Sequence, residues 1–184
     1  MDGTRSVGKL EGLRFLPSPN FNARPDGEVV NLLVIHNISL PPGEFGNHYI
    51  DQLFCNELDS TAHPSFERLN LKDLKVSAHF LIDRTGTVTQ YVPITERAWH
   101  AGVSKWNGRE NCGDFSIGIE LEGTDEIPYT DAQYLELALL TKRLIQYFPA
   151  ISIDRIVGHS DIAPERKSDP GTAFDWPRYR ALLY

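Results

Sequence analysis

Apolar residues in this chain gather into short runs that follow strand-like patterns. Residues 28–36 (EVVNLLVIH) are nearly continuous in apolar side chains, which is typical of a central strand covered on both faces. Residues 75–82 alternate, break at DRTGT and resume at 88–92, a pattern that predicts a β-hairpin. Residues 115–121 (FSIGIEL) form a further alternating run. The pattern therefore predicts a sheet with at least one buried strand.

Helical signals occupy three other parts of the chain. Residues 49–58 carry apolar side chains at helical spacing. Thr130 with Gln133 three positions later predicts a capping box at the start of a long helix, which Pro149 ends. Asp175 predicts a cap for a short final helix. Helices thus alternate with the predicted strands.

This arrangement, with one long crossover and one hairpin, predicts an α/β (α+β) fold in which helices flank a central mixed β-sheet. A length of 184 residues suits one domain, and the chain has no repeat or linker. A hydrophobic fraction of 41% is enough for a packed core and argues against disorder. We expect a single domain over residues 1–184, with residues 1–16 peripheral to it.

Charge and cysteine content narrow the choice of partners and compartment. The net charge is −7 and no basic patch is present, so we expect no nucleic-acid partner. No apolar run approaches the roughly 20 residues of a membrane span, and the first 15 residues lack a signal-peptide pattern. Cys55 and Cys112 are too few for a disulfide framework. We expect a cytoplasmic protein that does not bind membranes and, since nothing indicates an extended interface, a monomer.

Two histidines stand at the ends of buried apolar runs. His36 ends the run 28–36, and His159 follows the run 153–158. Strands that lie side by side would bring both imidazoles to one edge of the sheet. Two imidazoles need only one carboxylate to complete a three-ligand metal site.

The carboxylate can come from either of two positions in GHSDIAPERKSDPG, residues 158–171. Asp161 completes a His-x-Asp step similar to that of facial-triad iron oxygenases, but those enzymes have a second histidine downstream and this chain has none after His159. Asp169 precedes a Pro-Gly turn that can fold its carboxylate back toward the metal. The residues favour Asp169 and leave Asp161, with iron, as the alternative.

Five blocks in order carry a resemblance to a known family. They are VIHNISLPPGEFG, VSAHFLI, RAWHAGVS, DFSIGIELEGTD and GHSDIAPERKSDPG. Together they resemble the cytoplasmic zinc-dependent N-acetylmuramoyl-L-alanine amidases of Gram-negative bacteria that act on anhydro-muropeptides, over nearly the whole chain from about Pro17 to Tyr179. The resemblance implies a mixed sheet with helices on its faces, as in the peptidoglycan-recognition superfamily.

The resemblance also implies an activity and assigns roles. It places one zinc ion on His36, His159 and Asp169, and gives catalytic roles to Glu120 and Lys167. The implied reaction is hydrolysis of the amide between the lactyl group of anhydro-N-acetylmuramic acid and L-alanine of the stem peptide. Three protein ligands leave a position on zinc for water, and a cation such as Lys167 can stabilise an oxyanion. In the cell this reaction recycles peptidoglycan and keeps inducers of β-lactamase low.

The strand pattern is compatible with two roles for Glu120. Alternation places it on the face opposite Ile119, where an acid above the metal can take a proton from water and return it to the leaving amine. The alternative is that Glu120 and Glu122 solvate an edge strand. Gly118 argues for the first role, because a small residue leaves room for close approach.

Substrate contacts are the least constrained part of the sequence. The candidates are Asn37, Lys75, Trp99, His100 and Arg109. The family often has arginine at the positions of Lys75 and Asn111, so we expect weaker bidentate recognition of carboxylates in this chain. The main alternative function is a muropeptide-binding module without catalysis, as in relatives that have lost metal ligands.

Overall fold

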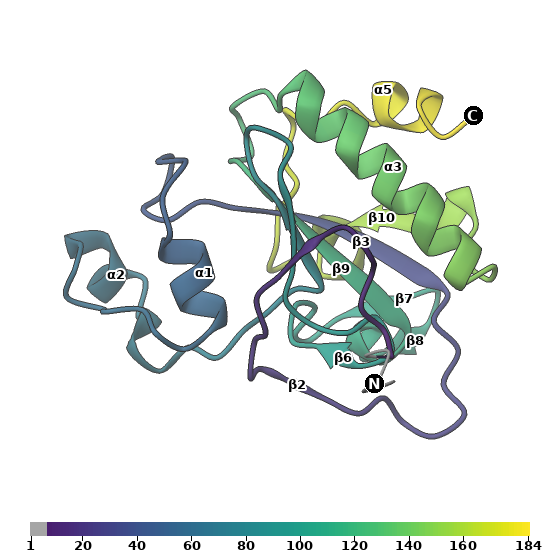
Figure 1. Ribbon diagram of the computed structural model, residues 1–184, viewed down its shortest axis with the longest axis horizontal. Helices are drawn as coiled ribbons and strands as arrows, with labels where there is room; N and C mark the ends of the chain where they lie inside the picture. The colour runs from purple at the N-terminus through teal and green to yellow at the C-terminus, as the bar shows by residue number, and fades with distance from the viewer. Residues whose placement is uncertain (1–6) are drawn as a thin grey trace, which may run out of the picture.

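The computed structural model describes residues 7–184, and a six-stranded sheet runs through its centre (Figure 1). In spatial order the strands are β1 (Arg14–Phe15), β5 (Val88–Gln90), β4 (Phe80–Ile82), β9 (Ser116–Glu122), β3 (Leu32–Ile38) and β10 (Ile156–Gly158). Strands β4 and β5 pair antiparallel as the predicted hairpin, and all other neighbours in this sheet are parallel. The predicted mixed sheet is confirmed.

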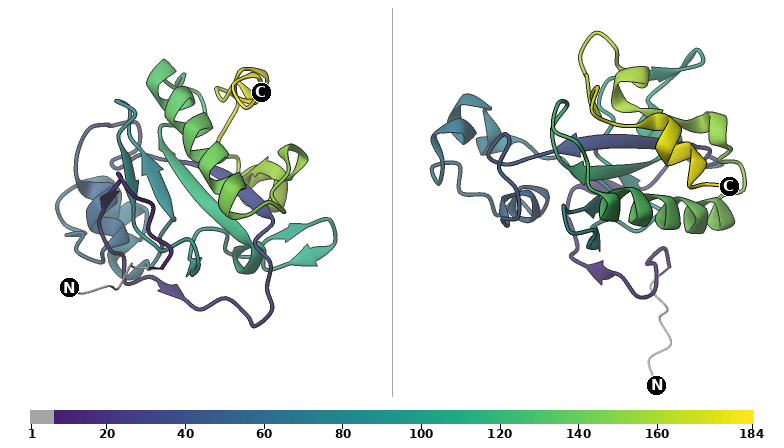
Figure 2. Two further views of the ribbon diagram at one scale, coloured as in Figure 1. Left: turned by 45° about the vertical axis from the view of Figure 1, so that its right-hand side comes forward. Right: turned by 90° about the horizontal axis from the view of Figure 1, so that it is seen from above.

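Helices and smaller elements surround this sheet. They are α1 (Tyr49–Phe54), α2 (Pro64–Arg68), α3 (Asp131–Tyr147), α4 (His159–Ile162), α5 (Trp176–Ala181) and the 3₁₀ helices η1 (Leu71–Asp73), η2 (Cys112–Phe115) and η3 (Ile153–Arg155). Two short antiparallel pairs join β2 (Phe21–Asn22) to β6 (Arg97–Ala98) and β7 (Lys105–Trp106) to β8 (Arg109–Glu110). Figure 2 shows α3 and α5 together on one side of the sheet. Helices α1 and α2 lie next to each other, away from α3 and α5.

Alternation along β3 and β9 divides their side chains between two faces. Leu33 and Ile35 on β3, with Ile117 and Ile119 on β9, are fully buried in the same core cluster as the apolar stripe of α3. The residues between them, including Val34 and His36 on β3, belong to the opposite face. Burial of the α3 face stabilises the fold because it removes apolar surface from water. The opposite face packs a second apolar cluster around Leu32 and Val34, and His36 follows these residues on that face.

The predicted capping box at the start of α3 is present and also fastens the helix to the sheet. The Thr130 hydroxyl accepts from the Gln133 backbone N–H, and the Gln133 side-chain oxygen accepts from the Thr130 N–H, both at 3.1 Å. The Gln133 amide then donates to the carbonyl oxygens of Ile82 and Glu122. One local motif therefore sets the position of α3 over β4 and β9.

Several boundaries differ from the sequence prediction: α1 ends at Phe54, not at residue 58, and the two hairpin strands are shorter than predicted. Strand β3 begins at Leu32 and runs to Ile38, so His36 lies inside the strand and not at its end. The apolar run 153–158 is half 3₁₀ helix and half strand, and the polar stretch after it begins with α4. The difference at β3 arises because pairing with β9, which extends to Glu122 opposite Ile38, decides where β3 ends.

The N-terminal segment expected to be peripheral contributes to the fold. Residues 1–6 of it lie outside the described residues. Leu10 is buried in the core cluster under α3, and Arg14–Phe15 pair with β5 at the edge of the sheet. The assignment of residues 1–184 to one domain stays a prediction. Among residues 7–184, no helix combines the length and apolar character that crossing a membrane requires.

Candidate metal and catalytic site

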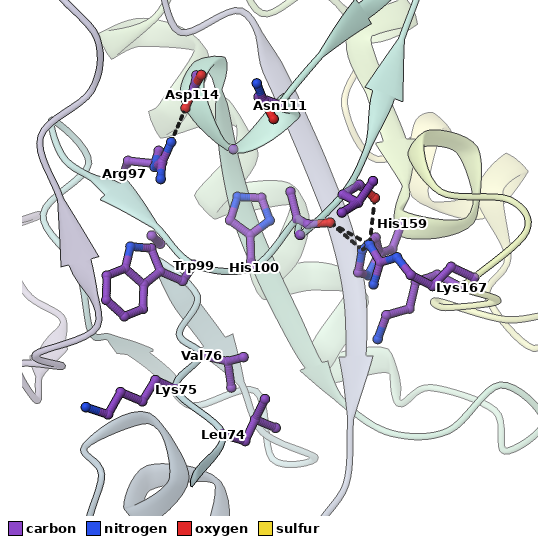
Figure 3. Close-up of a pocket in the computed structure, with 16 residues that line it drawn as sticks. Leu74, Lys75, Val76, Arg97, Trp99, His100, Asn111, Asp114, His159 and Lys167 are labelled. Atoms are coloured by element: carbon purple, nitrogen blue, oxygen red, sulfur yellow. Dashed lines mark hydrogen bonds and ion pairs between the residues drawn. The ribbon is translucent and has the colours of Figure 1, made fainter. Parts of the chain in front are cut away.

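Two adjacent parallel strands bring His36 and His159 together. Strand β10 pairs with β3 so that Gly158 lies opposite Ile35, and the residues that follow these two are the histidines. Their Nδ1 atoms lie 2.9 Å apart, although 123 positions separate them in the sequence. Both side chains are buried, and His159 lines the cavity drawn in Figure 3. The predicted meeting of the two imidazoles is confirmed.

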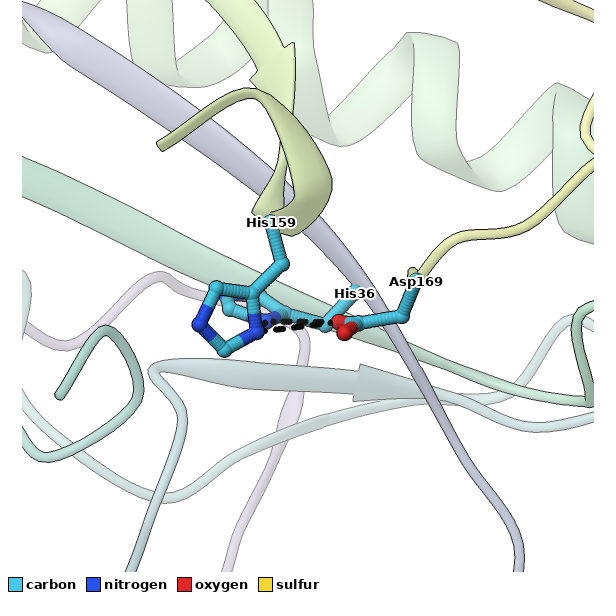
Figure 4. Close-up of side chains that lie close together, drawn as sticks. All are labelled: His36, His159 and Asp169. Atoms are coloured by element: carbon cyan, nitrogen blue, oxygen red, sulfur yellow. Dashed lines mark hydrogen bonds and ion pairs between the residues drawn. The ribbon is translucent and has the colours of Figure 1, made fainter. Parts of the chain in front are cut away.

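Asp169 approaches the two imidazoles from the loop after α4 (Figure 4). Its Oδ2 atom lies 3.1 Å from the Nδ1 atom of each histidine. Atoms bound tetrahedrally at about 2.0–2.2 Å from zinc lie about 3.3–3.6 Å from one another. The three donor atoms converge to within a few tenths of an ångström of that spacing, so this nitrogen and oxygen donor set fits a three-ligand zinc site.

Asp161, the alternative carboxylate, has a different position and role. It is exposed, and its Oδ2 atom accepts the backbone N–H of Gly158 at 2.7 Å. This bond occupies one of the otherwise unpaired N–H groups at the start of α4. The group of possible metal ligands contains Asp169 and not Asp161, so the structure does not assemble the facial triad that Asp161 would complete.

The surroundings of the cluster favour the protonation states that metal binding requires. Burial lowers the pKa of His36 to about 4, against the opposing effect of its hydrogen bond to Asp169. Burial alone would raise the pKa of Asp169, but hydrogen bonds from His159 and His36 hold that pKa well below its usual range. A neutral His36 and an ionised Asp169 are the forms that bind metal ions.

Glu120 stands directly beside His36 on the neighbouring strand. Strand β9 lies between β4 and β3, and Glu120 is opposite His36 in the register. Its Oε2 atom is buried and has no hydrogen-bond partner within residues 7–184. Burial and the negative charge of Asp169 raise the pKa of Glu120 well above its usual value.

The edge-strand alternative for the two glutamates is wrong. Strand β9 is central, and Glu122 is only 2% exposed. Its carboxylate accepts the backbone N–H groups of Gly46 and Arg84. Glu122 is therefore structural, whereas Glu120 presents an unpaired carboxyl group next to the histidine cluster.

Comparison with known proteins assigns this arrangement to a family. A family model described as N-acetylmuramoyl-L-alanine amidase matches residues 26–172, a span that includes the three clustered residues and Glu120. The chain belongs to this amidase family. The predicted resemblance is confirmed.

Individual members of the amidase family match this chain over nearly its full length. The 1,6-anhydro-N-acetylmuramyl-L-alanine amidase AmpD of Salmonella typhimurium (strain SL1344) is 59% identical, with 96% of this chain and 92% of that protein covered. The crystal structure of a selenomethionine derivative of AmpD superposes with a TM-score of 0.92 at 58% identity, covering 96% of this chain and 97% of that one. The fold class is confirmed at the level of the whole chain.

A more distant amidase has been solved with its substrate. This is AmiD from E. coli, in complex with anhydro-N-acetylmuramic acid-L-Ala-D-γ-Glu-L-Lys. The TM-score is 0.60 at 29% identity, with 86% of this chain and 60% of that chain covered.

The histidine cluster of this amidase opens onto two cavities. The larger, about 900 Å³, contains the three clustered residues and Glu120 and has an apolar wall formed by Leu69, Leu71, Leu74 and Val76. The other, about 650 Å³, is lined among others by Lys75, Arg97, Trp99, Asn111 and Asp114 (Figure 3). His100, His159 and Lys167 belong to both linings. The cluster therefore lies where the two cavities meet.

Three of the five residues expected to contact substrate line the smaller cavity, namely Lys75, Trp99 and His100. Arg109 lies elsewhere: its guanidinium pairs with Glu28 and lies 4.0 Å from the centre of the Phe115 ring. The structure therefore does not bring Arg109 to this site, because the β7–β8 pair turns it toward Glu28.

Asn37, the fifth of these residues, lines the larger cavity but is already engaged with the protein. Its amide donates to the Asp125 carboxylate at 2.8 Å and to the Pro170 carbonyl at 3.2 Å. The Tyr129 hydroxyl donates to the same carbonyl at 2.8 Å. These bonds hold the loop that carries Asp169 against the residue next to His36. A direct contact of Asn37 with substrate stays a prediction.

Sequence reasoning missed two features of this amidase site. The apolar wall comes from α2, η1 and the residues after them, which are too short and irregular to show a period. Arg166, which lines both cavities, donates to the carbonyl oxygens of Ala101 and Val103. In the sequence, only the position of Arg166 within the polar stretch 158–171 indicates that it belongs to the site.

Proposed function

We propose that this chain is a zinc-dependent amidase that hydrolyses the bond between the lactyl group of anhydro-N-acetylmuramic acid and L-alanine of the stem peptide, in cell-wall recycling. The observation that carries the proposal is the convergence of His36, His159 and Asp169 beside the unpaired carboxyl group of Glu120. A protein that only bound muropeptides would need neither. Family membership and the AmpD relatives support the same activity.

The residues of the site have two separate chemical roles, metal binding and proton transfer. A zinc ion bound by His36, His159 and Asp169 would supply a Lewis acid and lower the pKa of a bound water to about 7. Glu120 accepts a proton from the attacking water at its buried Oε2 atom and returns it to the leaving nitrogen of L-alanine. A raised pKa suits the second half of this transfer, because the carboxyl group then holds its proton until the amine departs.

Substrate recognition in this proposal uses both cavities. The peptide bound to AmiD contains a γ-linked D-glutamate, so an acidic group must be accommodated if this chain takes the same ligand. Lys75 and Lys167 line the smaller cavity, and the described part of the chain gives neither ammonium group an ion-pair partner. Arg97, by contrast, is paired with Asp114. We propose that Lys75 binds substrate carboxylates and that Lys167 stabilises the oxyanion.

The setting of the reaction is part of the same proposal. Cys55 and Cys112 are both free thiols, as suits a reducing compartment. We propose that the protein acts as a monomer in the cytoplasm on soluble anhydro-muropeptides. Cell fractionation and light scattering test these two points independently of the chemistry.

Metal analysis with an activity assay tests the proposal directly. We expect about one zinc ion and no iron per purified chain, and release of the stem peptide from anhydro-muropeptide that stops after EDTA treatment and returns with zinc. Mass spectrometry of the metal and chromatography of the products measure both. Stoichiometric iron would favour the oxygenase alternative. A zinc-loaded protein that binds muropeptide without cleaving it would establish the binding module instead.

Replacing Lys167 by alanine tests the oxyanion role. Removing one stabilising group from an oxyanion site typically lowers turnover by about 10²–10³-fold, so we expect kcat to fall in that range while zinc content stays at one per chain. Steady-state kinetics and metal analysis on the same sample measure the two effects. Lys142→Ala, an exposed lysine of α3 on the far side of the sheet, is the control. Parallel loss of zinc and turnover in the Lys167 variant would contradict the assignment.

A further inference from the structure

His100 is placed below the metal cluster and not at the open surface. It follows β6, is 9% exposed, and its imidazole lies against the backbone of Gly118 in β9. A Cβ atom at position 118 would overlap the ring of His100. Glycine at this position of a central strand therefore makes room for this imidazole, which accounts for the small residue between Ser116 and Glu120.

The two ring nitrogens of His100 connect His36 to the start of β9. Its Nδ1 atom lies 2.9 Å from the Nε2 atom of His36, whose other nitrogen faces Asp169 and His159. Its Nε2 atom lies 3.2 Å from the hydroxyl oxygen of Ser116. If Nδ1 of His36 binds a metal ion, its proton is on Nε2, and Nδ1 of His100 is the acceptor that meets it.

Ala101, the next residue in the chain, contacts the outer nitrogen of His159 in a similar way. The Ala101 carbonyl oxygen lies 3.1 Å from the Nε2 atom of His159, and Arg166 donates to that carbonyl at 2.8 Å. Two consecutive residues thus face the outer nitrogens of two histidines that are far apart in the sequence. His79, the nearest other imidazole, is occupied: it accepts from the Gly118 N–H, and its second nitrogen lies 3.0 Å from the Glu96 carbonyl.

We propose that His100 is a positioning residue that accepts the Nε2–H of His36 and thereby fixes the orientation and tautomer in which His36 binds the metal. The inference rests on the proposed zinc site and replaces the substrate contact that the sequence suggested for His100. Outer partners of metal-binding histidines typically contribute about 10–100-fold to metal affinity or activity. Here that partner is a neutral side chain for one histidine and a backbone carbonyl for the other.

Two substitutions separate positioning from substrate contact. His100→Phe keeps an aromatic ring and removes the acceptor, and we expect zinc affinity to fall about 10–100-fold. His100→Asn keeps an oxygen near the position of Nδ1, and we expect affinity within a few fold of wild type. Competition with a chromophoric chelator measures affinity, and kinetics at saturating zinc should give an unchanged KM for both variants. Unchanged zinc affinity with a raised KM in His100→Phe would overturn the proposal, as would equal loss of affinity in both variants.

A measurement on the unmodified protein does not depend on how the variants fold. Long-range ¹H–¹⁵N NMR of the zinc-loaded wild-type protein reports which ring nitrogen carries each proton. We expect His36 and His100 both to carry it on Nε2. A proton on Nδ1 of His100 would overturn the inference while leaving the zinc site intact. Failure of the wild-type protein to bind zinc at all would instead contradict the proposed function, and this inference with it.

Discussion

Asp169→Ala should abolish amide hydrolysis and release zinc, whereas Asp161→Ala should do neither. The Oδ2 atom of Asp169 lies 3.1 Å from both histidine nitrogens, so its removal leaves two neutral imidazoles without a charged ligand. We expect zinc affinity to fall by more than the roughly 10–100-fold that loss of an outer partner causes. Zinc content after dialysis and release of stem peptide measure the effect.

Asp161→Ala is a matched control because it removes a carboxylate from α4, eight positions before Asp169. The Oδ2 atom of Asp161, the third residue of α4, accepts the N–H of the N-cap Gly158, so its loss should lower stability by about 0.5–1.5 kcal/mol, the net value of one hydrogen bond. Thermal unfolding measures this change. The assignment would be wrong if Asp161→Ala lost zinc while Asp169→Ala retained it.

Glu120→Gln should lower kcat by about 10²–10⁴-fold with zinc affinity and KM close to wild type. Glutamine has nearly the same shape as glutamate, but it cannot take a proton from water and return it to the leaving amine. The Oε2 atom of Glu120 has no hydrogen-bond partner within residues 7–184, so the substitution breaks no hydrogen bond of that atom. Steady-state kinetics on zinc-loaded protein measure the loss.

Glu122→Gln, two residues further along β9, is the control for that prediction. Glu122 accepts two backbone N–H groups, and its replacement should cost about 1–3 kcal/mol of stability by leaving one of them poorly paired. The folded, zinc-loaded fraction should keep its turnover. If Glu122→Gln lost as much turnover per zinc-loaded molecule as Glu120→Gln, a specific proton-transfer role for Glu120 would be untenable.

Local patterns predicted β3, β4, β5, β9 and β10 of the central sheet and the helices α1, α3 and α5, because short-range forces produce them, but not the shorter elements. The Thr130 capping box is made within four residues, and the hairpin of β4 and β5 follows from alternation around a turn. The predicted ends of these elements were less accurate than their positions. Strand β3 continues past His36 because it pairs with β9 as far as Glu122. This pairing depends on a distant part of the chain, so the local pattern around His36 does not show it.

The site was predicted unevenly, and the failures have a common cause. The histidines were found because each belongs to an apolar run, and Asp169 because a Pro-Gly turn follows it. Arg109 was wrongly grouped with the site because the sequence does not show that it pairs with Glu28. His100 was assigned to substrate because a histidine near a tryptophan gives no sign of the glycine that accommodates its ring.

The sequence by itself determined the class of fold, the family and the residues able to bind a metal ion, since these follow from local periodicity and from ordered motifs. Only the tertiary structure decided which groups meet. Pairing of β10 with β3 places Gly158 opposite Ile35, and a shift of one residue would turn His36 and His159 to opposite faces of the sheet. That register depends on burial and hydrogen bonding summed over the whole sheet, and no short stretch of sequence contains it.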